Sequence, residues 1–454
     1  MFSKNKIVLK NCHKYLAIIL LLLFCCEEIP NKPERDNIFD PNAKFDSEPP
    51  VAKISVSQDT GFINETYFEF SAENSMETEH PNAVLYYKWD FNNDGIWDTE
   101  LSSKKNIKVI YSDTDHSILN SITLNGPGEQ TIRLFVLGAS DTSTLTSYTI
   151  YVYDHPKIEL DWKVDIIASR FYFDISGSVD WTGDTSVQCR WDFNNDDQWD
   201  TDWINDKSIS FLIDDSFGSN WKTKLKIKDK YNLTSEKFTE LYKPDLSDLI
   251  AYYPFSGNTL DSSGNNLNGT NNGAELSMDR YGNPESAYYF DGSQSYIDLG
   301  LDNLLKPEDA FSLSIWVKNT RPLTSAYPVV GIFTNNDNCD RNYAVNFWLN
   351  SVNAGNGETY AYVKRIGSSL DKWVHYVIVF SDYPGSYNNL QAYVNTNQAG
   401  SEWSGDISGL SYTGSPAVIG KICNYYFQGH LDEIYIYNRR LSINDIQNLY
   451  HSIK

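Results

Sequence analysis

The chain has little methionine, little cysteine and few basic side chains for its acidity. Its 454 residues include 3 Met, 6 Cys and 37 Lys and Arg, against 60 Asp and Glu, so the formal net charge is −23. Phosphate binding needs basic patches, so the charge balance argues against nucleic acid as a partner. The scarcity of methionine and of long amphipathic stretches favours an all-β protein. The 31 Tyr and 12 Trp suit strands and binding surfaces.

Familiar catalytic motifs are also missing. The sequence has neither a His-Glu-x-x-His zinc motif nor a Gly-x-Ser-x-Gly nucleophile elbow. His375 lies in an apolar run beside Trp373, where a packed histidine is expected rather than a catalytic one. We therefore expect a protein that is not an enzyme.

The first 50 residues have the features of an export segment and a tether. Lysines precede an apolar run from Tyr15 to Phe24, which is too short to span a bilayer as a mature helix. Cys25 and Cys26 follow at once, which resembles the lipobox of bacterial lipoproteins. The resemblance implies a signal peptide over residues 1–26, a lipid on one of the two cysteines, and a place at the outer membrane or cell surface. An ordinary cleaved signal or a single anchor helix is the alternative. The proline-rich residues 27–50 predict an extended tether.

One stretch occurs twice. Trp89–Thr99 and Trp191–Thr201 share the order Trp-Asp-Phe-Asn-Asn-Asp, followed by Trp-Asp-Thr. The copies are about one hundred residues apart, the size of a sandwich domain, and short alternating runs surround each copy. The sequence therefore predicts two tandem β-sandwiches, over residues 51–154 and 155–244.

These two regions resemble a known family. Tyr87–Gly95 is similar to the Trp-Asp-Phe signature of PKD (polycystic kidney disease) Ig-like domains, and Pro127–Ile132 to that family's Pro-Gly-x-Tyr turn and strand. The match is weaker in residues 155–244. The resemblance implies Ig-like spacers or contact modules.

The acidic residues of the repeat have two readings. Asp90, Asn92, Asp94 and Gly95 fit the opening of an EF-hand loop, but its twelfth position is Leu101 instead of glutamate. In the second copy Asp197 replaces the glycine, so the stretch is not an EF-hand. A core strand followed by a turn explains most of the pattern. A looser calcium site from Asp90, Asp94 and Asp98 is the alternative.

Residues 246–454 predict a third domain. Alternating runs at Phe311–Lys318, Trp373–Phe380 and Leu390–Asn395 indicate strands, and Ser442 is placed to cap a short helix that ends near Tyr450. Seven separated segments, from Leu249–Phe255 to Phe427–Tyr437, arrive in the order of the LamG-like jelly roll of the concanavalin A-like lectin/glucanase superfamily, which this domain resembles. The resemblance implies a jelly-roll sandwich that recognises glycans or proteins, often with a structural calcium ion.

The family pattern implies which oxygens would hold that calcium. The candidates are Asp261, Asn268, Asp291 and Asp432. Backbone carbonyls and water would complete the six to eight oxygens that calcium takes. Plain turn chemistry is the competing reading, because Asp-Ser-Ser-Gly and Asp-Gly form turns without a metal.

The same superfamily contains glucanases with Glu-x-Asp-x-x-Glu on one strand. The best-placed run here, His430–Tyr435, lacks both glutamates at that spacing, which argues against a glycosidase. In an exported chain Cys339 and Cys423 are expected to form a disulfide, and Cys189 to be a buried free thiol.

Ligand contacts are expected from loops at one end of the jelly roll. The candidates are Tyr327, Asp337, Arg341, Tyr387 and Trp403, although ordinary surface aromatics are as good an explanation. Taken together, the sequence predicts a lipid-anchored, cell-surface binding or adhesion protein. Its LamG-like domain would recognise an extracellular polysaccharide or a surface or matrix protein. The rivals are a structural surface component without a defined ligand and, less favoured, a glycoside hydrolase accessory protein.

Overall fold

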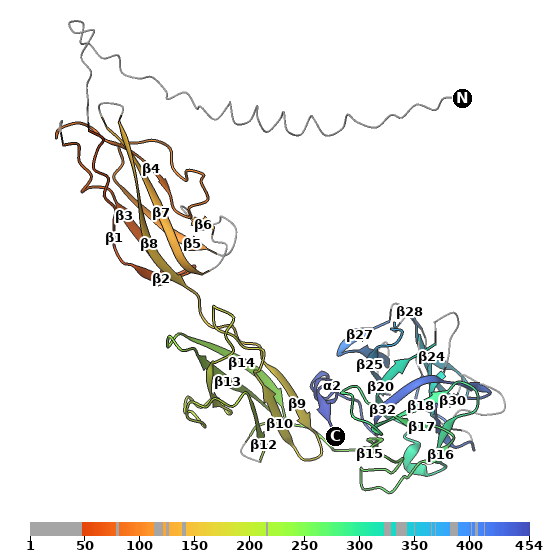
Figure 1. Ribbon diagram of the computed structural model, residues 1–454. Coiled ribbons are helices and arrows are strands. Elements are labelled where there is room, and N and C mark those ends of the chain that lie inside the picture. The colour runs from red at the N-terminus through yellow and green to blue at the C-terminus, as the bar shows by residue number, and fades with distance from the viewer. Residues whose placement is uncertain are drawn as a thin grey trace, which may run out of the picture. The chain divides into compact units, whose positions relative to one another are not determined.

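The computed structural model describes residues 48–78, 81–112, 121–123, 127–138, 142–214, 217–321, 328–332, 343–348, 350–364, 366–367, 369–381, 389–400, 402–404, 407–412 and 414–454. The chain divides into two compact units between Tyr151 and Val152 (Figure 1). Within the described residues, no helix is long and apolar enough to cross a membrane.

The first unit is a β-sandwich. One sheet has the order β1 (Ser55–Val56), β3 (Tyr67–Ser71), β5 (Asn106–Ser112), β6 (Ser121–Thr123), and the other β2 (Thr60–Phe62), β8 (Ser143–Tyr153), β7 (Gly128–Leu137), β4 (Tyr86–Asp90). Alternation turns Tyr87 and Trp89 of β4 inward. The ring of Trp89 lies 6.1 Å from that of Phe70 on β3, so aromatic side chains from both sheets form the core.

The second unit begins with another sandwich. Its sheets are β12 (Ser208–Leu212), β10 (Arg170–Asp174), β9 (Asp161–Asp165), β33 (Ser452–Ile453), and β11 (Gln188–Asp192), β13 (Asn220–Lys228), β14 (Thr234–Tyr242). The rings of Phe173 and Trp191, one from each sheet, are 4.8 Å apart in its core. Burying such a side chain stabilises the fold by about 1.5–3 kcal/mol.

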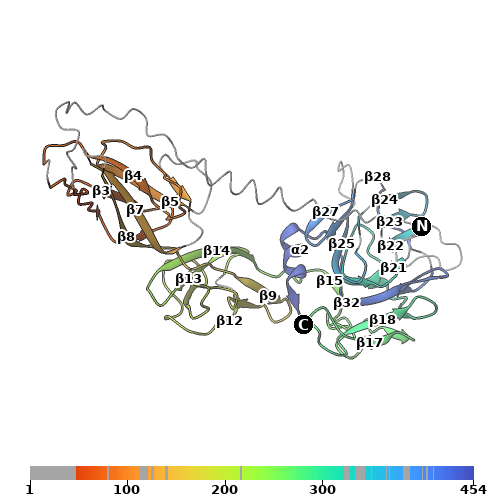
Figure 2. The ribbon, with the colours of Figure 1, turned by 45° about the horizontal axis from the view of Figure 1, so that its top comes forward.

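The rest of the second unit is a jelly-roll sandwich (Figure 2). The order of its first sheet is β17 (Glu275–Ser277), β18 (Ala287–Asp291), β32 (Gln428–Tyr437), β20 (Ala310–Asn319), β25 (Trp373–Ser381), β26 (Leu390–Val394), β27 (Asn397–Ala399), with β15 (Leu249–Tyr253) also paired to β32. The second is β16 (Thr270–Asn272), β19 (Tyr296–Gly300), β29 (Ala417–Ile419), β21 (Pro328–Ile332), β22 (Tyr343–Trp348), β23 (Ser351–Asn356), β24 (Tyr360–Lys364), β28 (Glu402–Ser404). A 3₁₀ turn η1 (Asn303–Leu305) and the hairpin β30 (Lys421–Ile422), β31 (Tyr425–Tyr426) complete it. The predicted all-β architecture with a final jelly roll is confirmed.

The jelly roll and the second sandwich share a hydrophobic cluster. It joins Phe171 and Leu241 of the sandwich to Tyr435 of β32 and to Ile446 and Leu449 of α2 (Ile443–Tyr450). β33 then pairs in parallel with β9, so the last described strand belongs to the sandwich sheet. The predicted cap is confirmed: Ser442 Oγ accepts from the Asp445 amide, and the Asp445 carboxylate accepts from the Ser442 amide.

Candidate functional site

Most of the expected ligand and anchor residues lie outside the described part of the chain. These are Cys25, Cys26, Tyr327, Asp337, Cys339, Arg341 and Tyr387. Trp403 lies on β28, opposite Val363 of β24.

Cys423 is buried, and its disulfide with Cys339 stays a prediction. Cys189 is a buried free thiol, as predicted.

Two of the calcium candidates meet in one loop. The Asp261 amide donates to Asn268 Oδ1 over 3.0 Å. The Asp261 carboxylate accepts from the amides of Tyr252, at 2.9 Å, and Leu267, at 3.0 Å. The Ser263 amide, at 2.9 Å, and the Ser263 hydroxyl, at 2.8 Å, donate to the same carboxylate. The four bonds fasten the loop to β15 and occupy the lone pairs that a cation would use.

Asp291 and Asp432 lie elsewhere on the first jelly-roll sheet. Asp291 ends β18 opposite Gln428, and its carboxylate accepts from the Ser293 and Ser295 amides. Burial would raise the pKa of Asp291, but hydrogen bonds from Ser293, Gln294 and Ser295 outweigh it and hold the pKa well below its usual value. Asp432 lies opposite Trp316 of β20. The structure thus does not bring the four candidates together, and calcium stays a prediction.

The carboxylates of the repeated stretch are held by an arginine and by backbone amides. Asp90 Oδ2 lies 3.1 Å from the Arg133 guanidinium, Asp94 Oδ1 accepts from the Ile96 amide at 2.7 Å, and Asp98 Oδ2 from the Phe91 amide at 2.6 Å. The second copy repeats the last contact, from the Phe193 amide to Asp200 at 2.7 Å. This is the geometry of a core strand and a stapled turn. Among the described residues, no group of three or more His, Cys, Asp or Glu side chains is arranged to hold a metal ion.

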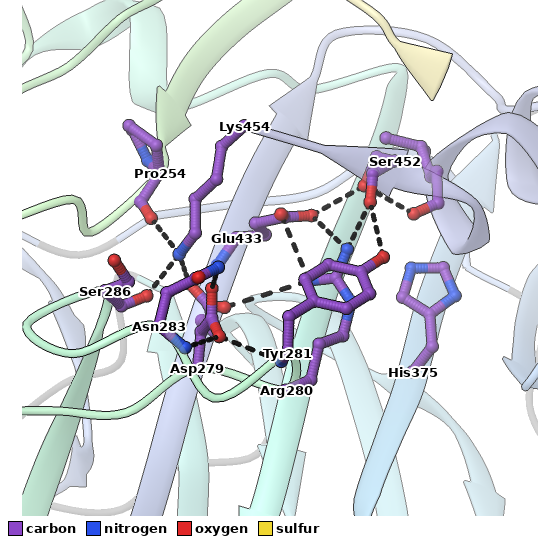
Figure 3. Close-up of polar contacts among 12 residues, drawn as sticks. Pro254, Asp279, Arg280, Tyr281, Asn283, Ser286, His375, Glu433, Ser452 and Lys454 are labelled. Carbon is purple, nitrogen blue, oxygen red and sulfur yellow. Dashed lines mark hydrogen bonds and ion pairs between the residues drawn. The ribbon is translucent and has the colours of Figure 1, made fainter. Parts of the chain in front are cut away.

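A group of buried polar side chains lies where the second sandwich and the jelly roll meet (Figure 3). Arg280 approaches both oxygens of the fully buried Glu433, at 3.1 Å each. Its guanidinium also lies 3.7 Å from Asp432. Ser452 Oγ donates to Glu433 over 2.6 Å, and the Lys454 ammonium donates to Asp432. We call these five residues the charge cluster.

Burial governs the protonation of the charge cluster. Burial and the neighbouring Glu433 raise the pKa of Asp432 to about 8, although Lys454 and Arg280 oppose the shift. Burial would lower the pKa of Arg280, but Glu433 and Asp432 outweigh it and keep the guanidinium charged. Both carboxyl groups are 0% exposed and contact basic side chains from other segments, so the cluster joins parts of the protein to one another.

His451 and β33 extend the charge cluster into the sandwich. The ring of His451 stacks on Trp162 of β9 with centroids 3.9 Å apart. Its carbonyl accepts from the Val164 amide over 3.0 Å. Residues 451–454 therefore contact β9 on one side and the buried carboxylates on the other.

Residues 291–447 match the family model of the concanavalin A-like lectin/glucanases superfamily. This segment is a concanavalin A-like lectin/glucanase domain. The resemblance drawn from the sequence is confirmed for the lectin-like domain, whereas the PKD and lipoprotein resemblances stay predictions. No curated protein compared with the chain matches it significantly.

Solved structures similar to the chain include domain 4 of AbnA, a GH43 extracellular arabinanase from Geobacillus stearothermophilus, in complex with arabinotriose. It shares 18% identity with a TM-score of 0.35, over 45% of this chain and 98% of that one. The receptor-binding domain of botulinum neurotoxin mosaic serotype C/D shares 17% identity with a TM-score of 0.34, over 45% of this chain and 51% of that one. The serotype D binding domain shares 17% identity with a TM-score of 0.35, over 45% and 52%. The chain thus spans about half the length of each toxin structure.

The charge cluster extends beyond the family match. Asp432 and Glu433 belong to the lectin-like domain, but Arg280 precedes residue 291, and Ser452 and Lys454 follow residue 447. Sequence reasoning missed Arg280, Glu433 and Lys454. The available signal was an acidic pair inside the apolar run Leu431–Tyr437, because charged residues are seldom buried without partners. The sequence offered no way to find those partners, because Arg280 is more than a hundred positions away and Ser452 and Lys454 follow the last helix.

Proposed function

We propose that the chain is a cell-surface binding protein whose lectin-like domain recognises an extracellular glycan or protein. The family match over residues 291–447 carries this proposal. The two sandwiches hold the domain away from the membrane, and a lipid on Cys25 or Cys26 anchors the chain at the outer membrane or cell surface. The apolar run that ends at these cysteines supports the anchor.

We propose binding without catalysis. A glycosidase needs two carboxyl groups that flank the bond it cleaves. The acidic pair of the lectin-like domain, Asp432 and Glu433, is buried and held by Arg280 and Lys454, so it has no open side for a sugar. This supports a recognition module over a hydrolase.

Binding is best tested with the mature chain, without the predicted signal peptide and lipid. The isolated lectin-like domain is unsuitable because one of its faces packs in a hydrophobic cluster shared with the second sandwich. We expect the chain to bind a restricted class on a glycan array or a defined surface protein. Binding to neither would favour the structural component. Hydrolysis of a bound glycan would contradict the non-catalytic proposal.

The anchor has its own test. Cells that express the full chain are labelled with an alkyne fatty acid. We expect label in the wild type, and its loss in either Cys25→Ala or Cys26→Ala but not in both. Label in neither the wild type nor the variants would remove the lipid from the proposal, and protease treatment of intact cells would report surface exposure.

A further inference from the structure

A cleft opens where the second sandwich meets the jelly roll. Its volume is about 570 Å³, within the range of small-ligand sites. One side is the outer face of the sheet that contains β9, β10 and β12, and the other is the Asp279–Asn283 loop with Ile453 and Lys454. Both sides belong to the second unit.

The floor of the cleft presents an aromatic ring among polar groups. In β10 the alternation buries Phe171 and Phe173 and exposes Tyr172 and Asp174. Tyr172 lies in register between Lys163 of β9 and Ser210 of β12. An exposed ring beside hydroxyl, ammonium and carboxylate groups is suited to stack on a sugar and bind its hydroxyls.

Two carboxylates, of Asp161 and Asp174, line the cleft together with Tyr172. Asp174 lies in register between Asp161 and Ser208. Hydrogen bonds from Ser176, then the charge of Lys163, lower the pKa of Asp174 and keep it an ionised acceptor. The three hydrogen bonds from Ser176 and Ser208 leave part of the about four lone pairs of this carboxylate to accept from a ligand hydroxyl.

The wall is held in place by its own hydrogen bonds. Asp279 accepts from the Tyr281 amide at 2.8 Å and from the Asn283 amide at 2.9 Å. Tyr281 Oη donates to the Ser452 carbonyl over 3.2 Å, and the Lys163 ammonium lies 4.3 Å from the Tyr281 ring centre. These contacts of Tyr281 link the wall to the floor, which reduces the ordering that a ligand must impose.

The charges of the cleft select among ligands. The charged lining residues are Asp161, Asp174 and Asp279 against Lys163 and Lys454, and the whole chain carries −23. An anionic ligand would meet repulsion, whereas an uncharged polyol would meet donors and acceptors of both kinds.

We propose that this cleft binds an uncharged oligosaccharide, with Tyr172 as the stacking platform and Asp174 as a hydroxyl acceptor. The inference rests on the proposed glycan-binding function, but it assigns a site in which the second sandwich takes part. The sandwich is then part of the receptor as well as a spacer. This site is distinct from the part of the lectin-like domain where Trp403 lies on β28.

The test uses the mature chain and calorimetric titration with cellohexaose, xylohexaose and mannohexaose, with hexagalacturonate as the acidic probe. We expect at least one neutral hexasaccharide to bind, and both Tyr172→Ala and Asp174→Asn to weaken that binding by roughly tenfold. Phe238→Ala is the matched control, because Phe238 is exposed on the other sheet of the same sandwich. It should leave affinity unchanged.

Three results would overturn the inference. The first is that no neutral hexasaccharide binds. The second is a preference for hexagalacturonate. The third is binding that Trp403→Ala abolishes while Tyr172→Ala and Asp174→Asn leave it intact, which would still support the proposed function of the lectin-like domain. Melting curves of each variant show whether it folds, and Asp174→Asn tests the site if Tyr172→Ala does not fold.

Discussion

The Arg280 guanidinium lies 3.1 Å from the Glu433 carboxylate, and both side chains are buried. Arg280 comes from the loop before β18 and Glu433 from β32, so the pair joins distant parts of the second unit. Ser452 Oγ donates to the same carboxylate over 2.6 Å. A buried carboxylate of this kind needs its partners, because water cannot replace them.

Removal of Arg280 should therefore be costly. We expect Arg280→Met to lower the free energy of unfolding by about 3–5 kcal/mol, because Glu433 is left buried without its cation. The matched control is Lys157→Met. Lys157 pairs with Glu159 at 3.2 Å, but its side chain is 72% exposed, and the loss of such a pair costs about 0–1 kcal/mol. Urea unfolding followed by tryptophan fluorescence would measure both, and equal losses would contradict the role of Arg280.

Because of Asp432, the free energy of unfolding should decrease as the pH rises. Its pKa is raised to about 8 by burial and by Glu433, against about 3.9 for an unfolded carboxyl. Between these values the folded chain keeps a proton that the unfolded chain releases, so stability decreases as pH rises. Burial lowers the pKa of His375 to about 3, which has the opposite effect, but that contribution is complete above an ordinary histidine pKa of about 6.5.

The window from about pH 7 to about pH 8 therefore isolates Asp432 from the histidines. We expect the melting temperature of the wild type to fall across this window and that of Asp432→Asn to stay level. Asp174→Asn is the control, because the pKa of Asp174 is lowered and the group is ionised in both states here. A wild-type melting temperature that is constant or rises would contradict the raised pKa.

Local alternation made much of the fold predictable. The runs at Phe311–Lys318 and Trp373–Phe380 appear as β20 and β25, within one or two residues at each end. Each strand consists of consecutive residues, and their alternation or their apolar run indicates a strand without reference to the rest of the chain. The copied Trp-Asp-Phe stretch likewise marks the same core strand, β4 and β11, in both sandwiches.

The contacts that build the site could not be predicted in this way. Tyr172 and Tyr281 line one cleft although more than a hundred residues separate them. β33 has only two residues, Ser452 and Ile453, and its parallel pairing with β9 has no local signature. Such contacts depend on tertiary packing, which a single sequence does not reveal.

A substitution of Asp261 can show whether this residue binds calcium or only holds its loop through hydrogen bonds. Its carboxylate accepts from the Tyr252 and Leu267 amides. We therefore expect Asp261→Ala to lower the melting temperature by the same amount in millimolar calcium and in chelator. A net hydrogen bond to a charged group contributes about 1.5–3 kcal/mol, so the loss should be measurable. A loss seen only in calcium would identify Asp261 as a ligand, and Asp302→Ala, at the cap of η1, is a control carboxylate.

Residues 451–454 should couple the second sandwich to the jelly roll. Truncation after Tyr450 removes the His451 ring from Trp162, strand β33 from β9, and two members of the charge cluster. The shared hydrophobic cluster remains, so both domains should still fold, but each with fewer contacts to the other. We expect calorimetry of the truncated chain to show the transition of the second unit broadened or split, at a lower temperature.

A single substitution can separate the contribution of strand β33 from that of the Lys454 charge. Lys454→Met removes the ammonium that bonds Asp432 but leaves β33 and the His451 stack in place. It should lower the melting temperature while the transition stays single, because the backbone pairing with β9 still links the domains. If the truncated chain melts as the wild type does, residues 451–454 do not couple the domains. In that case the hydrophobic cluster of α2 and β32 alone holds the walls of the cleft in place.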